Sequence, residues 1–164
     1  MTDEASITSA VAGSTYVVHT ASPMGLFKTE DEYVLPAVDG VLSVLRACKA
    51  NGGVRRCVMT SSVAACARPA EADMPANGIR DESHWSEIPN ECPHPLVMYC
   101  KSKTMAEKVA WDFLAALPEA EKFEFVTILP SYVMGPSLRA DWFASVEYLR
   151  KLMTGVDTVI PAGG

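Results

Sequence analysis

The 164-residue sequence lacks a basic cluster, a long apolar run and a regular spacing of metal-binding side chains. Lys and Arg number 14 against 20 Asp and Glu, so the net charge is −6 and no basic surface is expected to neutralise a nucleic-acid backbone. The longest uncharged stretch, residues 5–27, contains too many Ser and Thr residues for a membrane span. These absences predict a protein with no nucleic-acid partner and no membrane segment.

The five cysteines and three histidines are scattered along the chain. No two cysteines form a CxxC pair, which disfavours both a disulfide framework and a zinc site and favours a reducing, cytoplasmic compartment. The histidines are expected to be ordinary surface or loop residues, and no metal is predicted. Acidic residues near the start disfavour a secretory signal. The residues concerned are Cys48, Cys57, Cys66, Cys92, Cys100, His19, His84, His94, Asp3 and Glu4.

Apolar periodicity and turn residues predict four helices and four strands. Helices are expected from Asp3 to Ala12, from Pro36 as first residue to a stop at Gly52, over Val97–Leu117 and over Asp141–Met153. Strands are expected at Thr15–Thr20, Arg55–Ser61, Phe123–Leu129 and Thr158–Ile160, with a long polar loop from about Cys66 to Pro95.

The alternation of strands and helices indicates the fold class. The strands are apolar on both faces, which is typical of a parallel sheet buried between helices. Apolar residues make up 49% of the chain, enough for the core of one domain. The sequence therefore predicts an α/β domain with a parallel sheet.

Ligands of an open parallel sheet collect beyond the carboxyl ends of its strands. Three such segments carry small or hydroxyl residues: His19–Pro23, Thr60–Ser62 and Pro130–Pro136. Small side chains there let a flat ligand approach the backbone. Taken singly, each segment is equally well an ordinary turn after a strand.

Tyr99 and Lys103 are four residues apart on the predicted third helix, so they lie on one face. A nearby ammonium favours phenolate and would lower the pKa of Tyr99, which would suit it to exchange a proton with an alcohol or carbonyl. A hydroxyl from Ser62 would hold the same substrate oxygen. Alone, the pair is equally compatible with a tyrosine at the core edge beside a solvated lysine.

Five motifs occur in order along nearly the whole chain. In this order the chain resembles the extended short-chain dehydrogenase/reductase family (the NAD-dependent epimerase/dehydratase superfamily), and within it the dihydroflavonol reductase and cinnamoyl-CoA reductase branch. The motifs are Tyr16–Pro23, Pro36–Gly40, Arg56–Ser62, Tyr99–Lys103 with Ala106–Lys108, and Pro130–Pro136.

The resemblance implies a Rossmann-type fold and hydride transfer between NADPH and the carbonyl carbon of a small organic substrate, with NAD not distinguished from NADP. It implies that Tyr99 is the acid–base group, that Lys103 lowers its pKa and holds the nicotinamide ribose, and that Ser62 polarises the substrate oxygen. Ser61 is the alternative to Ser62. The cofactor-binding residues implied are Ala21, Ser22, Thr60, Ser61, Lys103, Pro130 and Val133.

The sequence departs from the family at the dinucleotide fingerprint, because none of its ten glycines forms a glycine-rich turn. The resemblance then implies that residues 1–164 are a partial, incomplete Rossmann-like domain, without the first strands and the C-terminal lobe. The substrate-binding part would start at about residue 137. The Cys66–Pro95 loop and Met98 would contribute to substrate choice.

Three alternatives stay open at this point. The chain is an incomplete record of a reductase, or a catalytically silent remnant that does not bind NADPH, or part of a nucleotide-sugar epimerase or dehydratase. The turn after Thr20 and the Ala106–Lys108 run favour the reductase branch. Apolar backbone at an exposed sheet edge is expected to cause self-association.

Overall fold

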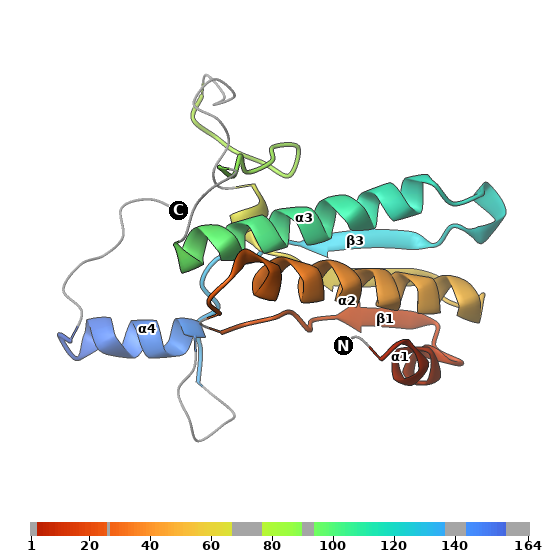
Figure 1. The fold of residues 1–164 in the computed structure, drawn as a ribbon, viewed down its shortest axis with the longest axis horizontal. Helices are drawn as coiled ribbons and strands as arrows, with labels where there is room; N and C mark the ends of the chain where they lie inside the picture. The colour runs from red at the N-terminus through yellow and green to blue at the C-terminus, as the bar shows by residue number, and fades with distance from the viewer. Residues whose placement is uncertain (1–2, 26, 67–76, 90–93, 137–143, 157–164) are drawn as a thin grey trace. The chain divides into compact units, whose positions relative to one another are not determined.

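A computed structural model describes residues 3–25, 27–66, 77–89, 94–136 and 144–156. The chain divides into two compact units, Met1–Leu129 and Pro130–Gly164, and each is described by itself. Among the described residues, the first unit contains a three-stranded sheet and its helices, and the second contains helix α4, Ala144–Met153 (Figure 1).

The sheet is parallel, and its strands lie in the order in which they occur along the chain. These are β1 (Tyr16–His19), β2 (Arg56–Thr60) and β3 (Glu124–Ile128). Val18, Val58 and Val126 lie side by side across the sheet. The predicted parallel α/β fold and its first three strands are confirmed with slightly shorter bounds, and the strand expected at 158–160 lies outside the described residues.

Helix α1 (Glu4–Val11) begins where the sequence predicts. The side chain of Asp3 accepts hydrogen bonds from the backbone N–H groups of Ala5 and Ser6, which have no partner inside the helix. The chain then turns at Gly13, whose φ of 75° suits a residue without a side chain.

Helix α2 (Glu30–Asn51) begins six residues before the predicted start at Pro36. Thr29 and Glu32 form a capping box: the Thr29 hydroxyl accepts from the Glu32 N–H, and the Glu32 carboxylate accepts from the Thr29 N–H at 3.0 Å. Pro36 therefore lies in the second turn of the helix. The predicted stop is correct, because Gly52 ends α2 with a left-handed φ of 62°.

Helix α3 (Pro95–Ala115) follows the short turn η1 (Val63–Ala65) and the loop described at residues 77–89, and precedes the short turn η3 (Glu119–Glu121). Its existence is confirmed, but not every apolar side chain of this segment faces the core. Met98 and Leu117 are buried, whereas Met105 is exposed. The buried side is instead formed largely by small and polar residues: Ser102, Lys103, Ala106, Glu107 and Ala110.

Helix α4 (Ala144–Met153) is the helix of the second unit. Its described residues fall within the predicted helix Asp141–Met153, whose first three residues lie outside the described part of the chain. Glu147 and Arg150 form an ion pair one turn apart, at 2.7 Å.

The core of the first unit lies between the sheet and the helices. Helices α2 and α3 run side by side along one face of the sheet (Figure 1), and Leu45, Cys57 and Ala110 meet there with almost no exposed surface. The side chains of Tyr16 and Val18 on the opposite face are 61% and 66% exposed. The prediction that the strands are buried on both faces is thus wrong for this unit as described.

Four cysteines lie within the described residues, and no disulfide joins any of them there: Cys48, Cys57, Cys66 and Cys100. Cys92 lies outside them. Within the described ranges, none of the helices has the length and apolar character needed to cross a bilayer.

Candidate functional site

The N-terminal half of α3 carries the predicted catalytic pair. The His94 ring accepts from the Leu96 N–H at 3.2 Å and caps the helix, and Pro95 occupies its first position. Tyr99, Lys103 and Glu107 follow at intervals of four residues, so they lie along one face of α3. The structure joins this face to the end of β2 through the hydrogen bond between Ser61 and Glu107, and Ser62 lies near Tyr99.

Ser62 and Tyr99 are brought together. Ser62 is the residue that begins η1, and its hydroxyl oxygen accepts from the Ala64 N–H at 3.1 Å. The Ser62 hydroxyl also lies close enough to the phenol of Tyr99 to lower its pKa, and the Tyr99 side chain is half-buried. A hydroxyl held by a backbone N–H and a partly accessible phenol are therefore in place to share one substrate oxygen.

Lys103 lies beside Tyr99 and is buried. Its Nζ is 5.9 Å from the centre of the Tyr99 ring. Burial lowers the pKa of the Lys103 ammonium, and the negative charge of Glu107 partly offsets this effect. The first unit thus keeps an amino group inside the protein within reach of the phenol.

The pKa of Tyr99 differs in direction from the sequence expectation. Burial raises it, and the hydrogen bond from Ser62 opposes that rise only in part. The neighbouring ammonium was expected to lower the pKa, but loss of hydration around the phenol is the larger effect in this structure. Tyr99 is therefore a protonated phenol at neutral pH.

Ser61 has a different environment from Ser62. Its hydroxyl donates a short hydrogen bond to Oε2 of the Glu107 carboxylate, and its backbone N–H donates to the Ile128 carbonyl at 2.8 Å. The two adjacent serines thus serve different partners, since Ser61 is joined to Glu107 and Ser62 to Tyr99. Sequence reasoning included Glu107 only within the Ala106–Lys108 run, although its spacing from Lys103 was visible.

The position of His19 differs from the expectation drawn from the sequence. It was expected to be an ordinary surface or loop residue, but it ends β1 and is only 8% exposed. Burial, and to a lesser degree the positive charge of Lys103, lowers the pKa of the His19 imidazole. His19 is the last residue of the apolar strand β1, and its side chain lies on the buried side of the sheet. No local motif indicated this position.

The remaining predicted cofactor residues are more dispersed. Thr60 ends β2 and is half-buried, while Ala21 and Ser22 follow β1 in the turn after His19. These three residues lie at the carboxyl ends of the strands, where the sequence placed them. Pro130 and Val133 belong to the second unit.

The loop at residues 77–89 is tied to the site by its last part. The Ser86 N–H donates to the Ala65 carbonyl at 2.7 Å, and its hydroxyl donates to the Ala64 carbonyl at 2.8 Å. The adjacent Trp85 ring lies against the Lys108 ammonium, 5.2 Å away. Residues 67–76 and 90–93 of the predicted substrate loop lie outside the described part of the chain.

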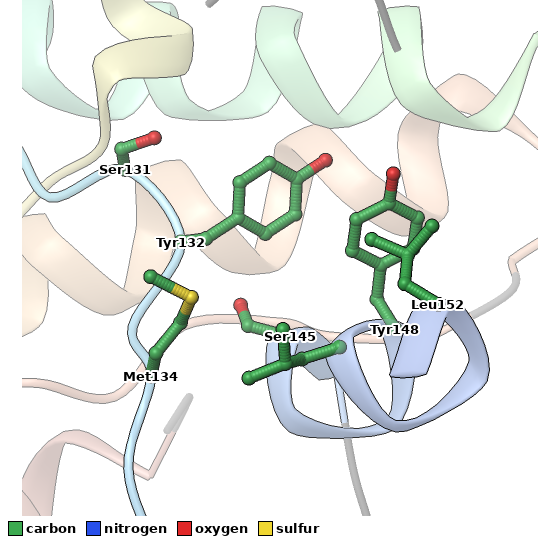
Figure 2. Close-up of a pocket in the computed structure, with 7 residues that line it drawn as sticks. Ser131, Tyr132, Met134, Ser145, Tyr148 and Leu152 are labelled. Atoms are coloured by element: carbon green, nitrogen blue, oxygen red, sulfur yellow. The ribbon is translucent and has the colours of Figure 1, made fainter. Parts of the chain in front are cut away.

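The second unit contains an apolar concavity of about 280 Å³. Figure 2 shows the rings of Tyr132 and Tyr148 next to each other in its wall, and the two rings are stacked. Their centres are 5.2 Å apart. The full lining is Ser131, Tyr132, Met134, Ser145, Tyr148, Leu149 and Leu152. Its aromatic and aliphatic walls suit an apolar group.

The described residues contain no group of three or more His, Cys, Asp or Glu side chains that would hold a metal ion. The arrangement at α3 instead offers a phenol, an ammonium and hydroxyls around one point. Such a set can donate a proton to an oxygen and stabilise the charge that develops on it.

Comparison with known proteins identifies the family. The model of the 3-beta hydroxysteroid dehydrogenase/isomerase family matches residues 1–159. The chain is 36% identical to tetraketide alpha-pyrone reductase 1 of Arabidopsis thaliana over 155 residues, which are 93% of the chain and 45% of that protein. It is also 36% identical to dihydroflavonol 4-reductase of Hordeum vulgare over 160 residues, 94% of the chain and 43% of the relative.

A solved structure shows the same fold. The yeast methylglyoxal/isovaleraldehyde reductase Gre2, complexed with NADPH, aligns with a TM-score of 0.70 and 32% identity, over 83% of this chain and 41% of that one. The chain spans less than half the length of these relatives. The order of its motifs, its parallel sheet and the family match lead to one conclusion: the chain belongs to the 3-beta hydroxysteroid dehydrogenase/isomerase family of extended short-chain dehydrogenases/reductases.

Proposed function

We propose that the protein carrying this chain is an NADPH-dependent reductase that converts the carbonyl group of a small organic molecule to an alcohol. The observation that carries the proposal is the position of buried Lys103 beside the Tyr99 phenol, with the Ser62 hydroxyl near the same phenol. The three relatives described above are all named as reductases, which favours this activity over nucleotide-sugar epimerisation or dehydration.

The site residues fit one end of the cofactor. An ammonium and several hydroxyls at the strand ends match a ribose and a nicotinamide, which take hydrogen-bond donors and acceptors. Small residues in the turn after β1, Ala21 and Ser22, leave the backbone open to a flat ring. The pyrophosphate requires a glycine-rich turn, and these 164 residues contain none.

In the proposed reaction, Tyr99 donates its proton to the substrate oxygen. Burial keeps the phenol protonated, as a proton donor must be, and the Ser62 hydroxyl stabilises negative charge that develops on the same oxygen. Bound NADPH supplies the hydride that reduces the carbonyl carbon. Lys103 stabilises the phenolate that Tyr99 becomes after it gives up its proton.

Further parts of the proposal concern the protein as a whole. Thr60, Ser61, Pro130 and Val133 contribute to the cofactor site, and the part from about residue 137 begins the substrate-binding region. The protein works in the cytoplasm. Residues 1–164 alone do not bind NADPH, and they self-associate through the exposed sheet edge, which is supported by the exposed Val18 side chain on the edge strand β1.

The proposed activity is tested by following NADPH consumption by the protein that carries this chain. Aldehydes and ketones form one substrate panel, and UDP-sugars form the other. We expect carbonyl-dependent oxidation of NADPH with the first panel and none with the second. Conversion of a UDP-sugar without net NADPH consumption would instead assign the protein to the epimerases.

A further inference from the structure

Glu107 is a buried carboxylate that the reaction scheme above does not use. It is 4% exposed and lies one turn beyond Lys103 and two turns beyond Tyr99 on α3. Burying a charged carboxylate is costly unless hydrogen bonds and an opposite charge compensate for it. Its surroundings therefore decide what it does.

Both oxygens of Glu107 accept hydrogen bonds. The Ser61 hydroxyl donates to Oε2, and the Trp111 indole N–H donates to Oε1 at 3.3 Å. Trp111 is fixed in turn by an edge-to-face contact with Phe125 of β3, with ring centres 4.8 Å apart. The carboxylate is thus held by β2 and by its own helix, and that helix is held by β3.

Lys103, one turn earlier on the same face of α3, provides a positive charge that acts on Glu107 at longer range than a direct ion pair. Among the described residues it is the one buried cation, and it interacts electrostatically with Glu107. The other titratable groups that face this pair are Tyr99 on α3, His19 at the end of β1 and Cys66 after η1. None of these three supplies a positive charge at neutral pH, because burial disfavours the charged form of His19.

The position of Ser61 connects Glu107 to the reacting groups. Ser61 immediately precedes Ser62, and its backbone is bonded to β3 while its side chain is bonded to Glu107. Any movement of Ser61 would move Ser62 relative to Tyr99. Glu107 therefore contacts both sides of the site: the strand end that carries one hydroxyl, and the helix that carries the phenol and the ammonium.

We propose that Glu107 is a positioning residue: it joins the end of β2 to α3 through Ser61, and it provides the counter-charge of buried Lys103. Together these two contacts keep Ser62, Tyr99 and Lys103 in the relative positions that the reaction needs. This role rests on the proposed function and adds a residue that does not touch the substrate.

The test replaces Glu107 by glutamine, which keeps the shape and hydrogen-bonding capacity of the side chain and removes its charge. The matched control is Asp112→Asn, which removes an exposed carboxylate from the same helix. In the full protein, we expect Glu107→Gln to lower kcat about tenfold with little change in the KM for the carbonyl substrate, whereas Asp112→Asn leaves both unchanged.

The pH profile separates positioning from a general loss of stability. The negative charge of Glu107 raises the pKa of Lys103, so without it this ammonium loses its proton at lower pH, and the alkaline limb of kcat should move to lower pH in Glu107→Gln. A variant with the alkaline limb and kcat of the parent protein would overturn the proposal.

A second measurement does not depend on activity. A double-mutant cycle compares the unfolding of four proteins: the parent, Lys103→Met, Glu107→Gln and the double variant. We expect Lys103→Met to raise the unfolding constant about tenfold more in the protein that has Glu107 than in the protein that has Gln at this position. Additive effects would overturn the pairing even in an active protein. If the pairing is found but the parent protein has no reductase activity, the proposed function fails and the structural link survives.

Discussion

The Nζ atom of Lys103 lies 5.9 Å from the centre of the Tyr99 ring, and both residues lie on the face of α3 that is joined to the end of β2. The ammonium is buried, whereas the phenol is half-buried. A substrate can thus reach the phenol while the charge that supports it stays out of water, where electrostatic effects are stronger.

Replacing Tyr99 by phenylalanine tests the proton donor. We expect Tyr99→Phe to lower kcat by a factor of about 100 or more in the full protein, because only the hydroxyl is lost and proton donation contributes at least that much. Tyr16→Phe is the matched control, since Tyr16 is exposed on the open sheet face. Full activity in Tyr99→Phe, measured by NADPH consumption, would remove Tyr99 from the mechanism.

The stability of residues 1–164 should depend on pH through His19. Its pKa is lower in the folded chain than in the unfolded chain, so the unfolded state binds the proton more readily. The stabilisation is therefore complete above the unfolded pKa of about 6.5 and is lost as the pH falls below it. Denaturant unfolding measured from about pH 8 to about pH 5 should show this decline.

His19→Gln is the control for this pH dependence, since it removes the titrating ring. The variant should lose the part of the decline that begins near pH 6.5, an approximate unfolded value for histidine. Asp81 and Glu147, whose carboxyl pKa values are lowered by hydrogen bonds from Ser83 and Arg150 respectively, act only at more acidic pH. An unchanged decline in His19→Gln would show that another group causes it.

The two adjacent glycines after α2 should respond differently to alanine. Gly52 has a φ of 62°, a conformation that costs about 1 kcal/mol or more for a residue with a side chain, although nothing lies close enough to clash with it. Gly53 has no positive φ, and an added Cβ would make only ordinary contacts.

Gly52→Ala is therefore expected to destabilise the first unit by about 1 kcal/mol. Gly53→Ala should be neutral or stabilising by a few tenths of a kcal/mol, since it restricts the unfolded chain. Urea midpoints of the two variants provide the comparison. Equal losses in both would contradict a role for backbone conformation at Gly52.

The exposed sheet face should promote association of residues 1–164 when they are produced alone. Val18 lies on that face in the edge strand β1, in register with Val58 of β2 and Val126 of β3, and a lysine there would place a charge within the apolar surface. We expect Val18→Lys to reduce the associated fraction measured by sedimentation or light scattering.

Leu35→Lys is the matched control for the sheet face. Leu35 is a comparably exposed apolar residue, but it lies on α2. This variant should leave association unchanged. Equal improvement by both substitutions would mean that net charge, and not the sheet face, controls the association.

The helices and strands could be predicted from the sequence because the residues that begin and end them act locally. Asp3 before α1, Gly52 after α2 and the apolar strand at β3 each act within a few residues. The start of α2 was misplaced because Pro36 was taken as a first residue, whereas the capping box at Thr29 and Glu32 decides where the helix begins.

The candidate site was less accessible to the same reasoning. Tyr99, Lys103 and Ser62 were singled out from spacing and from the family resemblance, and the structure brings them together. Glu107 and His19 were missed because their burial depends on which side of α3 and of β1 faces the core. Small residues such as Ala106 and Ala110 let α3 pack closely against the core, and the larger apolar side chain of Met105 stays exposed.

The strand order of the sheet has a consequence for the open face. Each connection, through α2 and then α3, moves the chain one strand further in the same direction, and right-handed crossovers then bring both helices to the same side. Extending the sheet beyond β3 with the same handedness would add helices only to the side already occupied. A helical layer over Val18 requires a polypeptide that reverses its direction of winding at the β1 edge, and such a reversal point is where α/β sheets form their ligand crevice.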